Sequence, residues 1–237
     1  MIALVAGEPL IFGRFFNATE PGLLRPLKLY TLELVRLLSV LSEASVASAL
    51  LKHVHVMLPF YSALPKSSKQ LTRLLVERWS ADEDEGVRIL AFLCLIRLTR
   101  LDQKSMYEST AKAMYLAYVK NCKFTSPGTW PLINFMRRSL AELFALDPKS
   151  AYNHAFVYVR QLSISLRNAV TLQKKESIQS VYNWQFVHSL HLWVQLLCAT
   201  HPSPHLEPLV YPVAQGNNTV DKASFCKLCR KNYPKSH

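Results

Sequence analysis

Cysteine and histidine side chains occur in this sequence at two spacings that metal sites use. Cys226 and Cys229 form a CxxC pair, and His188 and His191 lie one helical turn apart. A tetrahedral zinc site needs four ligands. After the cysteine pair the chain offers only His237, and no carboxylate or cysteine stands near the histidine pair in sequence. We therefore predict no metal site and no cofactor, with two free thiols near residue 229 and two structural histidines.

The residue patterns of catalysis are also missing. No Ser, Cys or Thr stands in a sharp-turn nucleophile motif, and the six glycines are too widely spaced to form a phosphate-binding loop. The acidic run at 82–85 is typical of a solvated joint between helices. Five cysteines, an odd number, indicate a reducing environment, and the apolar run at 89–96 is too short to span a membrane. We expect an intracellular protein that is not an enzyme and does not contact membranes.

The basic residues are concentrated in one segment. Of the 237 residues, 28 are Lys or Arg and 16 are Asp or Glu, which gives a formal net charge of +12 and favours a polyanionic partner. Residues 120–175 hold nine basic and two acidic residues, a net charge of +7. On the helix expected after Pro148, Arg160, Arg167 and Lys174 recur every seven residues and so share one face.

These residues predict a basic strip that contacts RNA phosphates. Arg137 and Arg138 stand on the preceding helix and Lys175 at the following turn, and guanidinium groups bind phosphate oxygens without reading base identity. The alternative is a solvated helix face whose arginines bond neighbouring carbonyls, or Glu142 and Asp147. The predicted RNA-binding residues are Arg137, Arg138, Arg160, Arg167, Lys174 and Lys175.

An aromatic stretch predicts a second surface, for a protein partner. Trp184, His188 and His191 fall on one stripe of an expected helix, and Tyr182 precedes them. Aromatic side chains at this spacing are more often core, but they also dominate the anchors of protein interfaces. The predicted partner-interface residues are Tyr182, Trp184, His188 and His191.

Apolar residues recur at spacings of three and four across residues 26–215, which predicts an all-α fold. Successive helices of about 15–25 residues with short breaks indicate stacked helical hairpins, an α-solenoid of the HEAT or armadillo kind; a compact irregular bundle is the alternative. One helix is expected over 177–200, and the last element is expected to end at Gln215. Residues 1–25 are expected to be an N-terminal lead-in, and residues 216–237 a basic, disordered tail.

Three segments carry a family resemblance. FVYVRQLSISLRNA and VYNWQFVHSL are followed by EPLVYPVAQ, which ends at Gln215. In order and spacing these segments resemble the core domain of the nucleolar complex protein 2 family. The likeness extends over residues 30–215 and is strongest over 124–215.

The resemblance implies a non-enzymatic ribosome biogenesis factor of the nucleus, found in the nucleolus and nucleoplasm. Members of this family assist assembly of the large ribosomal subunit, pair with sister nucleolar complex proteins and contact pre-ribosomal particles and pre-rRNA. Animal members are also linked to chromatin, so a corepressor that binds histones or acidic regulators is the alternative. Because family members are longer and differ after Gln215, we expect a partial or alternatively spliced form.

Overall fold

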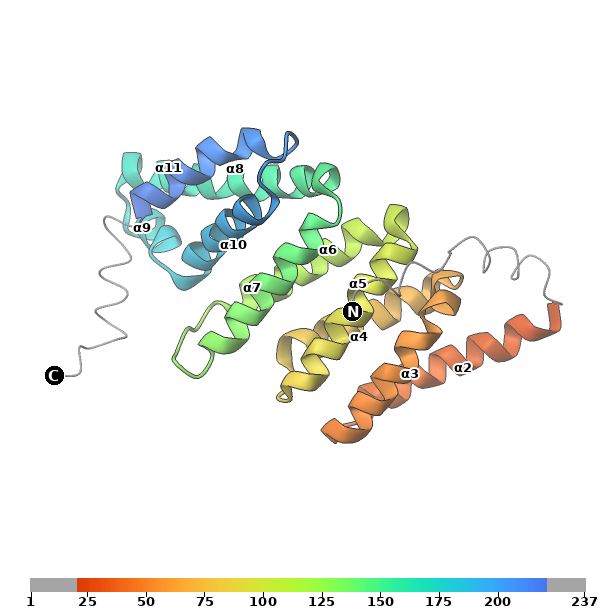
Figure 1. The fold of residues 1–237 in the computed structure, drawn as a ribbon. Coiled ribbons are helices and arrows are strands. Elements are labelled where there is room, and N and C mark those ends of the chain that lie inside the picture. Colours follow the sequence, from red (N-terminus) through yellow and green to blue (C-terminus); the bar gives the residue numbers. More distant parts are fainter. Residues whose placement is uncertain (1–20, 221–237) are drawn as a thin grey trace. The chain divides into compact units, whose positions relative to one another are not determined.

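The computed structural model describes residues 21–220, and the regular secondary structure in this range is entirely helical (Figure 1). The all-α prediction is confirmed. Within the described range no helix is both long and apolar enough to cross a lipid bilayer. The helices are α2 (Pro21–Val40), α3 (Ala44–Ser62), α4 (Pro65–Ala81), α5 (Glu85–Leu101), α6 (Gln103–Asn121), α7 (Trp130–Ala145), α8 (Pro148–Leu172), α9 (Lys175–Val181), α10 (Trp184–Thr200), the 3-10 helix η1 (Glu207–Leu209) and α11 (Val210–Val220).

The chain divides into two compact units, Met1–Ala113 and Met114–His237, and the boundary falls within α6. In the first unit α2 packs against α3 and α4, α3 also packs against α4 and α5, and α4 packs against α5. Contact between a helix and the second helix after it is typical of stacked hairpins. The packing inside this unit therefore agrees with the predicted stack, while a solenoid over the whole chain stays a prediction.

The first unit has a core of leucine and aromatic side chains. Four of its side chains are fully buried, namely Leu51 and Leu58 on α3 and Leu75 and Trp79 on α4. The Tyr61 hydroxyl donates a 2.8 Å hydrogen bond to the backbone oxygen of Thr31, which ties α3 to α2. Burial of each such side chain stabilises the fold by roughly 1.5–3 kcal/mol.

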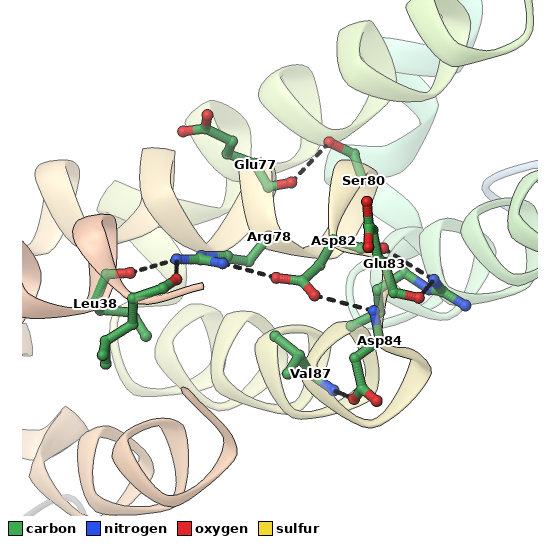
Figure 2. Close-up of polar contacts among 10 residues, drawn as sticks. Leu38, Glu77, Arg78, Ser80, Asp82, Glu83, Asp84 and Val87 are labelled. Atoms are coloured by element: carbon green, nitrogen blue, oxygen red, sulfur yellow. Dashed lines mark hydrogen bonds and ion pairs between the residues drawn. The ribbon is translucent and has the colours of Figure 1, made fainter. Parts of the chain in front are cut away.

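A partly buried ion pair joins three helices of the first unit (Figure 2). Arg78, near the end of α4, binds the Asp82 carboxylate at 2.9 Å, and the two side chains are only 17% and 11% exposed. The same guanidinium donates to the backbone oxygens of Leu38 and Leu41 at the end of α2. These carbonyls have no partner inside their helix, so Arg78 satisfies them. Asp82 also accepts a hydrogen bond from the backbone N–H of Asp84, the residue that caps α5.

The second unit is arranged around α10, which packs against α7, α8, α9 and α11. Trp193 on α10 lies at the centre of an aromatic core, with ring centroids 5.5 Å from Tyr115 and 5.3 Å from Phe144. Tyr115 stacks on Tyr158 of α8 at 3.9 Å. A neighbouring apolar cluster joins α8, α9 and α10 through Ala169, Val181, Phe186, Val187 and Leu190.

Several predicted boundaries are wrong. The helix α2 begins at Pro21, inside the expected lead-in. The helix expected over 177–200 is broken at Tyr182, after which the Asn183 side chain accepts a hydrogen bond from the Phe186 N–H and starts α10. The last helix runs to Val220 rather than Gln215. Residues 1–20 of the lead-in and 221–237 of the tail, with Cys226 and Cys229, lie outside the described residues.

Candidate nucleic-acid interface

The helix that carries the predicted basic row begins as the sequence predicts. The Asp147 carboxylate accepts hydrogen bonds from the backbone N–H groups of Lys149 and Ser150, both at 3.2 Å, and Pro148 stands in the first turn. An acidic cap also complements the positive end of the helix dipole. The side chains of α8 that are buried in the core are small: Ala151, Ala155, Val159 and Ala169. The helix ends before Gln173, whose backbone is left-handed with a φ of 50°.

Arg160 and Arg167 are exposed on α8, and the neighbouring polar row of Gln161 and Asn168 is exposed beside them. Among the described residues neither arginine forms an ion pair. Both arginines therefore face solvent. Their charges remain available to an external anion, and contact with RNA stays a prediction.

Lys174 does not continue the row along α8, contrary to the heptad argument. The helix ends at Leu172, and Lys174 caps α9 with an extended backbone, at φ −71° and ψ 145°. Lys175 is the first residue of α9, and both lysines are exposed. Arg138 is exposed on α7, where Glu142 is also exposed one turn further along. The exposed basic residues are therefore spread over three helices, and we name this set of Arg138, Arg160, Arg167, Lys174 and Lys175 the basic set.

Arg137 is directed into the fold and does not belong to this set. Its Nε donates a 2.8 Å hydrogen bond to Gln195 Oε1 on α10, and its Nη2 donates a 2.7 Å bond to Asn134 Oδ1. The residue is half-buried. Because its guanidinium donates to the amide oxygens of two neighbours, Arg137 is not grouped with the exposed basic residues, and its contact with RNA stays a prediction.

His188 is fully buried, so its prediction as a partner-interface residue is wrong and its prediction as a structural histidine is confirmed. Nε2 is hydrogen-bonded to Thr125 Oγ1 at 3.0 Å, and Nδ1 is buried without a partner among the described residues. The Tyr118 hydroxyl donates to the backbone oxygen of His188 at 2.9 Å. Burial, with smaller contributions from the nearby charges of His191 and Arg137, lowers the pKa of His188 to about 4.

The other predicted partner residues surround His188 and reach solvent. Trp184 and His191 are partly exposed, with ring centroids 5.7 Å and 6.2 Å from that of His188. Trp130 of α7 lies 5.5 Å from the same ring and is also partly exposed. Tyr182 is exposed at the break between α9 and α10. These residues can contact a partner, and that role stays a prediction.

The sequence reasoning missed an exposed aromatic residue between α6 and α7. Phe124 is 74% exposed, and the Lys123 ammonium lies 5.3 Å from its ring centroid. The available signal was an aromatic residue beside a lysine, directly before the turn sequence Thr-Ser-Pro-Gly.

Two of the described cysteines are buried. Burial raises the pKa of Cys94 and of Cys122 to about 12, so both stay protonated thiols near neutral pH. Cys198 is exposed on α10. Over residues 21–220 no group of three or more His, Cys, Asp or Glu side chains is placed to hold a metal ion.

Comparison with known proteins identifies a family. The profile of the Noc2p family matches residues 105–223. Nucleolar complex protein 2 of Drosophila melanogaster is 51% identical over 187 residues, which are 79% of this chain and 24% of that protein. An uncharacterized NOC2 family protein of Schizosaccharomyces pombe is 36% identical over 85% of this chain and 30% of its own length. Nucleolar complex-associated protein 2 of Arabidopsis thaliana is 33% identical over 70% of this chain and 21% of its own length. The chain thus spans between a fifth and a third of the length of these relatives.

Proposed function

Because the chain belongs to the Noc2p family, we propose that it is a non-enzymatic ribosome biogenesis factor of the nucleolus and nucleoplasm. In this role it is a helical scaffold for assembly and intranuclear transport of the large ribosomal subunit. It binds sister nucleolar complex proteins through one surface and pre-rRNA through another. The names of its relatives, which describe nucleolar complex proteins, support the compartment.

The exposed basic set is the observation that carries the RNA part of this proposal. Its five residues project from α7, α8 and α9 of the second unit, and none of them forms an ion pair within the described chain. A group of unpaired cations binds phosphates favourably, because binding releases the counterions of the nucleic acid. Contacts of this kind position a protein on RNA without reading its sequence.

The partner surface rests on the partly exposed rings near the start of α10. Tyr182, Trp184 and His191 reach solvent next to a well-packed core. Aromatic side chains on a rigid support are frequent anchors of protein interfaces. We propose that a sister nucleolar complex protein covers these rings.

A charge-reversal variant tests the RNA role. Replacing all five residues of the basic set by Glu is expected to lower the affinity for structured RNA at least tenfold and to flatten the dependence of binding on salt concentration. The matched control reverses five exposed basic residues of the first unit, Lys52, Lys66, Lys69, Arg73 and Arg100. Equal loss in both variants would show that binding follows net charge and not this surface.

Crosslinking in cells separates this proposal from the chromatin alternative. We expect pre-rRNA and sister nucleolar complex proteins to be recovered with the protein. Recovery of histones without pre-rRNA would contradict the proposal and favour a corepressor.

A further inference from the structure

Phe124 is a large apolar side chain that is exposed to solvent, and this exposure does not stabilise the fold. The residue is 74% exposed, compared with 42% for Phe156 on α8. Burying a phenylalanine normally stabilises a fold by more than a single hydrogen bond does. The exposed Phe124 does not provide this stabilisation. An exposed ring of this kind is available to a ligand.

The loop that carries Phe124 is held in place by its own hydrogen bonds. The Thr129 hydroxyl accepts a 2.9 Å bond from the Ser126 N–H, and the Trp130 N–H donates a 2.9 Å bond to the Ser126 backbone oxygen. Thr125, directly after the phenylalanine, is bonded to the buried His188. A ring on an ordered loop loses little conformational freedom when a ligand binds, and this favours affinity.

The surroundings of the ring are positively charged. Lys123 lies over the ring, with Nζ 5.3 Å from the centroid, and Lys120 is exposed on the last turn of α6. The sequence contains no acidic residue between Glu108 and Glu142, and α10, which packs against α7, contains none either. A negatively charged ligand therefore meets no carboxylate from these segments.

We propose that Phe124, with Lys120 and Lys123, forms a binding site for unpaired nucleotides of RNA. The phenyl ring stacks on one base, and the two ammonium groups bind the adjoining phosphates. Every base has a π-face, so such a site accepts single-stranded RNA of many sequences. A base inside a duplex keeps its faces stacked on its neighbours, so the site excludes duplex RNA. This inference rests on the proposed RNA-binding function and adds the type of RNA that one loop recognises.

The test compares single-stranded and duplex RNA on the full chain. Phe124→Ala is expected to lower the affinity for an unstructured oligouridine about 5- to 150-fold and to leave binding of a duplex of the same length unchanged. Phe124→Tyr should retain binding because it keeps the ring, whereas Phe124→Leu, which keeps an apolar side chain, should lose it. Phe156→Ala is the matched control and should bind like the unchanged chain. Ultraviolet crosslinking to the oligouridine should place a nucleotide adduct on Phe124.

The outcomes separate this inference from the proposed function. Unchanged oligouridine affinity in Phe124→Ala, with loss in the basic-set variant, would overturn the stacking site and leave the RNA-binding surface standing. Duplex binding without any binding of oligouridine to the unchanged chain would do the same. No binding of either RNA would overturn both. Loss of a sister nucleolar complex protein from Phe124→Ala, with RNA binding intact, would assign the ring to a protein pocket instead.

Discussion

The Arg137 guanidinium and the Gln195 amide are joined by a 2.8 Å hydrogen bond from Nε to Oε1, and this bond links α7 to α10. Arg138, the next residue in the chain, is exposed. Two adjacent arginines therefore have different surroundings, because successive residues on a helix point about 100° apart. One arginine stabilises the second unit, and the other is available to a ligand.

Replacing Arg137 is expected to reduce stability more than replacing Arg138. Arg137→Ala removes the two hydrogen bonds that the charged guanidinium donates, and it leaves the two accepting amide oxygens without this donor. The free energy of unfolding should therefore fall by about 1.5–3 kcal/mol. Arg138→Ala should change it by no more than about 0.5 kcal/mol. Urea unfolding followed by circular dichroism measures both values. Similar losses in the two variants would contradict the inward placement of Arg137.

Arg78 is expected to be among the most sensitive positions of the first unit. Arg78→Met leaves the Asp82 carboxylate partly buried without its cation and the carbonyls at the end of α2 without a donor (Figure 2). We expect a loss of roughly 2–4 kcal/mol in the free energy of unfolding. Arg78→Lys should recover only part of it, because one ammonium cannot reach the three acceptors in the planar geometry of a guanidinium.

The control for this prediction is Arg73→Met, at an exposed position of the same helix. It should change stability by less than about 0.5 kcal/mol. Thermal unfolding of the three variants gives the comparison. An Arg78→Met protein as stable as the Arg73→Met protein would show that the ion pair contributes nothing net.

Helix type and order were predictable here because each element has a strong local pattern. The helix α8 begins at Asp147 and Pro148. The Asp147 carboxylate caps free backbone N–H groups, and proline has no N–H group that would need a partner in the first turn. The break at Tyr182 was missed because neither proline nor glycine marks it. Asn183 was the available signal, as asparagine is a preferred helix cap.

The placement of single side chains was less predictable, because it depends on which neighbour a helix packs against. His188 and His191 share a stripe in sequence, yet only His188 is fully buried. Lys174 fits the seven-residue spacing of Arg160 and Arg167, but the left-handed backbone at Gln173 ends the helix before it. Residues spaced by seven share a face only while they belong to the same helix.

Gly216 is expected to fix the approach of α11 to α10. A Cβ at this position would lie 3.2 Å from Leu190 Cδ2, and Leu190 is buried. Gly216→Val should therefore overpack this contact and lower the free energy of unfolding by about 1–3 kcal/mol. Ala214→Val, on the exposed side of α11, is the control. Equal stability of the two variants in urea unfolding would show that Leu190 accommodates the larger side chain.

Protonation of His188 is expected to destabilise the fold under mildly acidic conditions. Its pKa is about 4 in the folded chain, chiefly because of burial, against an ordinary value of 6.5. The unfolded chain therefore binds a proton at a pH where the folded chain does not. The contribution of neutral His188 is fully present above pH 6.5 and is lost as the pH falls from 6.5 toward 4.

For a shift of this size the loss between pH 7.5 and pH 5 is about 2 kcal/mol. Urea unfolding at the two pH values measures it. His188→Gln retains a partner for Thr125 but cannot be protonated. Between pH 7.5 and pH 5 its free energy of unfolding should therefore fall by about 2 kcal/mol less than that of the unchanged chain. His205→Gln, at an exposed position, controls for the loss of a histidine. The prediction fails if His188→Gln and the unchanged chain lose the same free energy, because that result would mean that His188 is hydrated and able to carry its proton inside the fold.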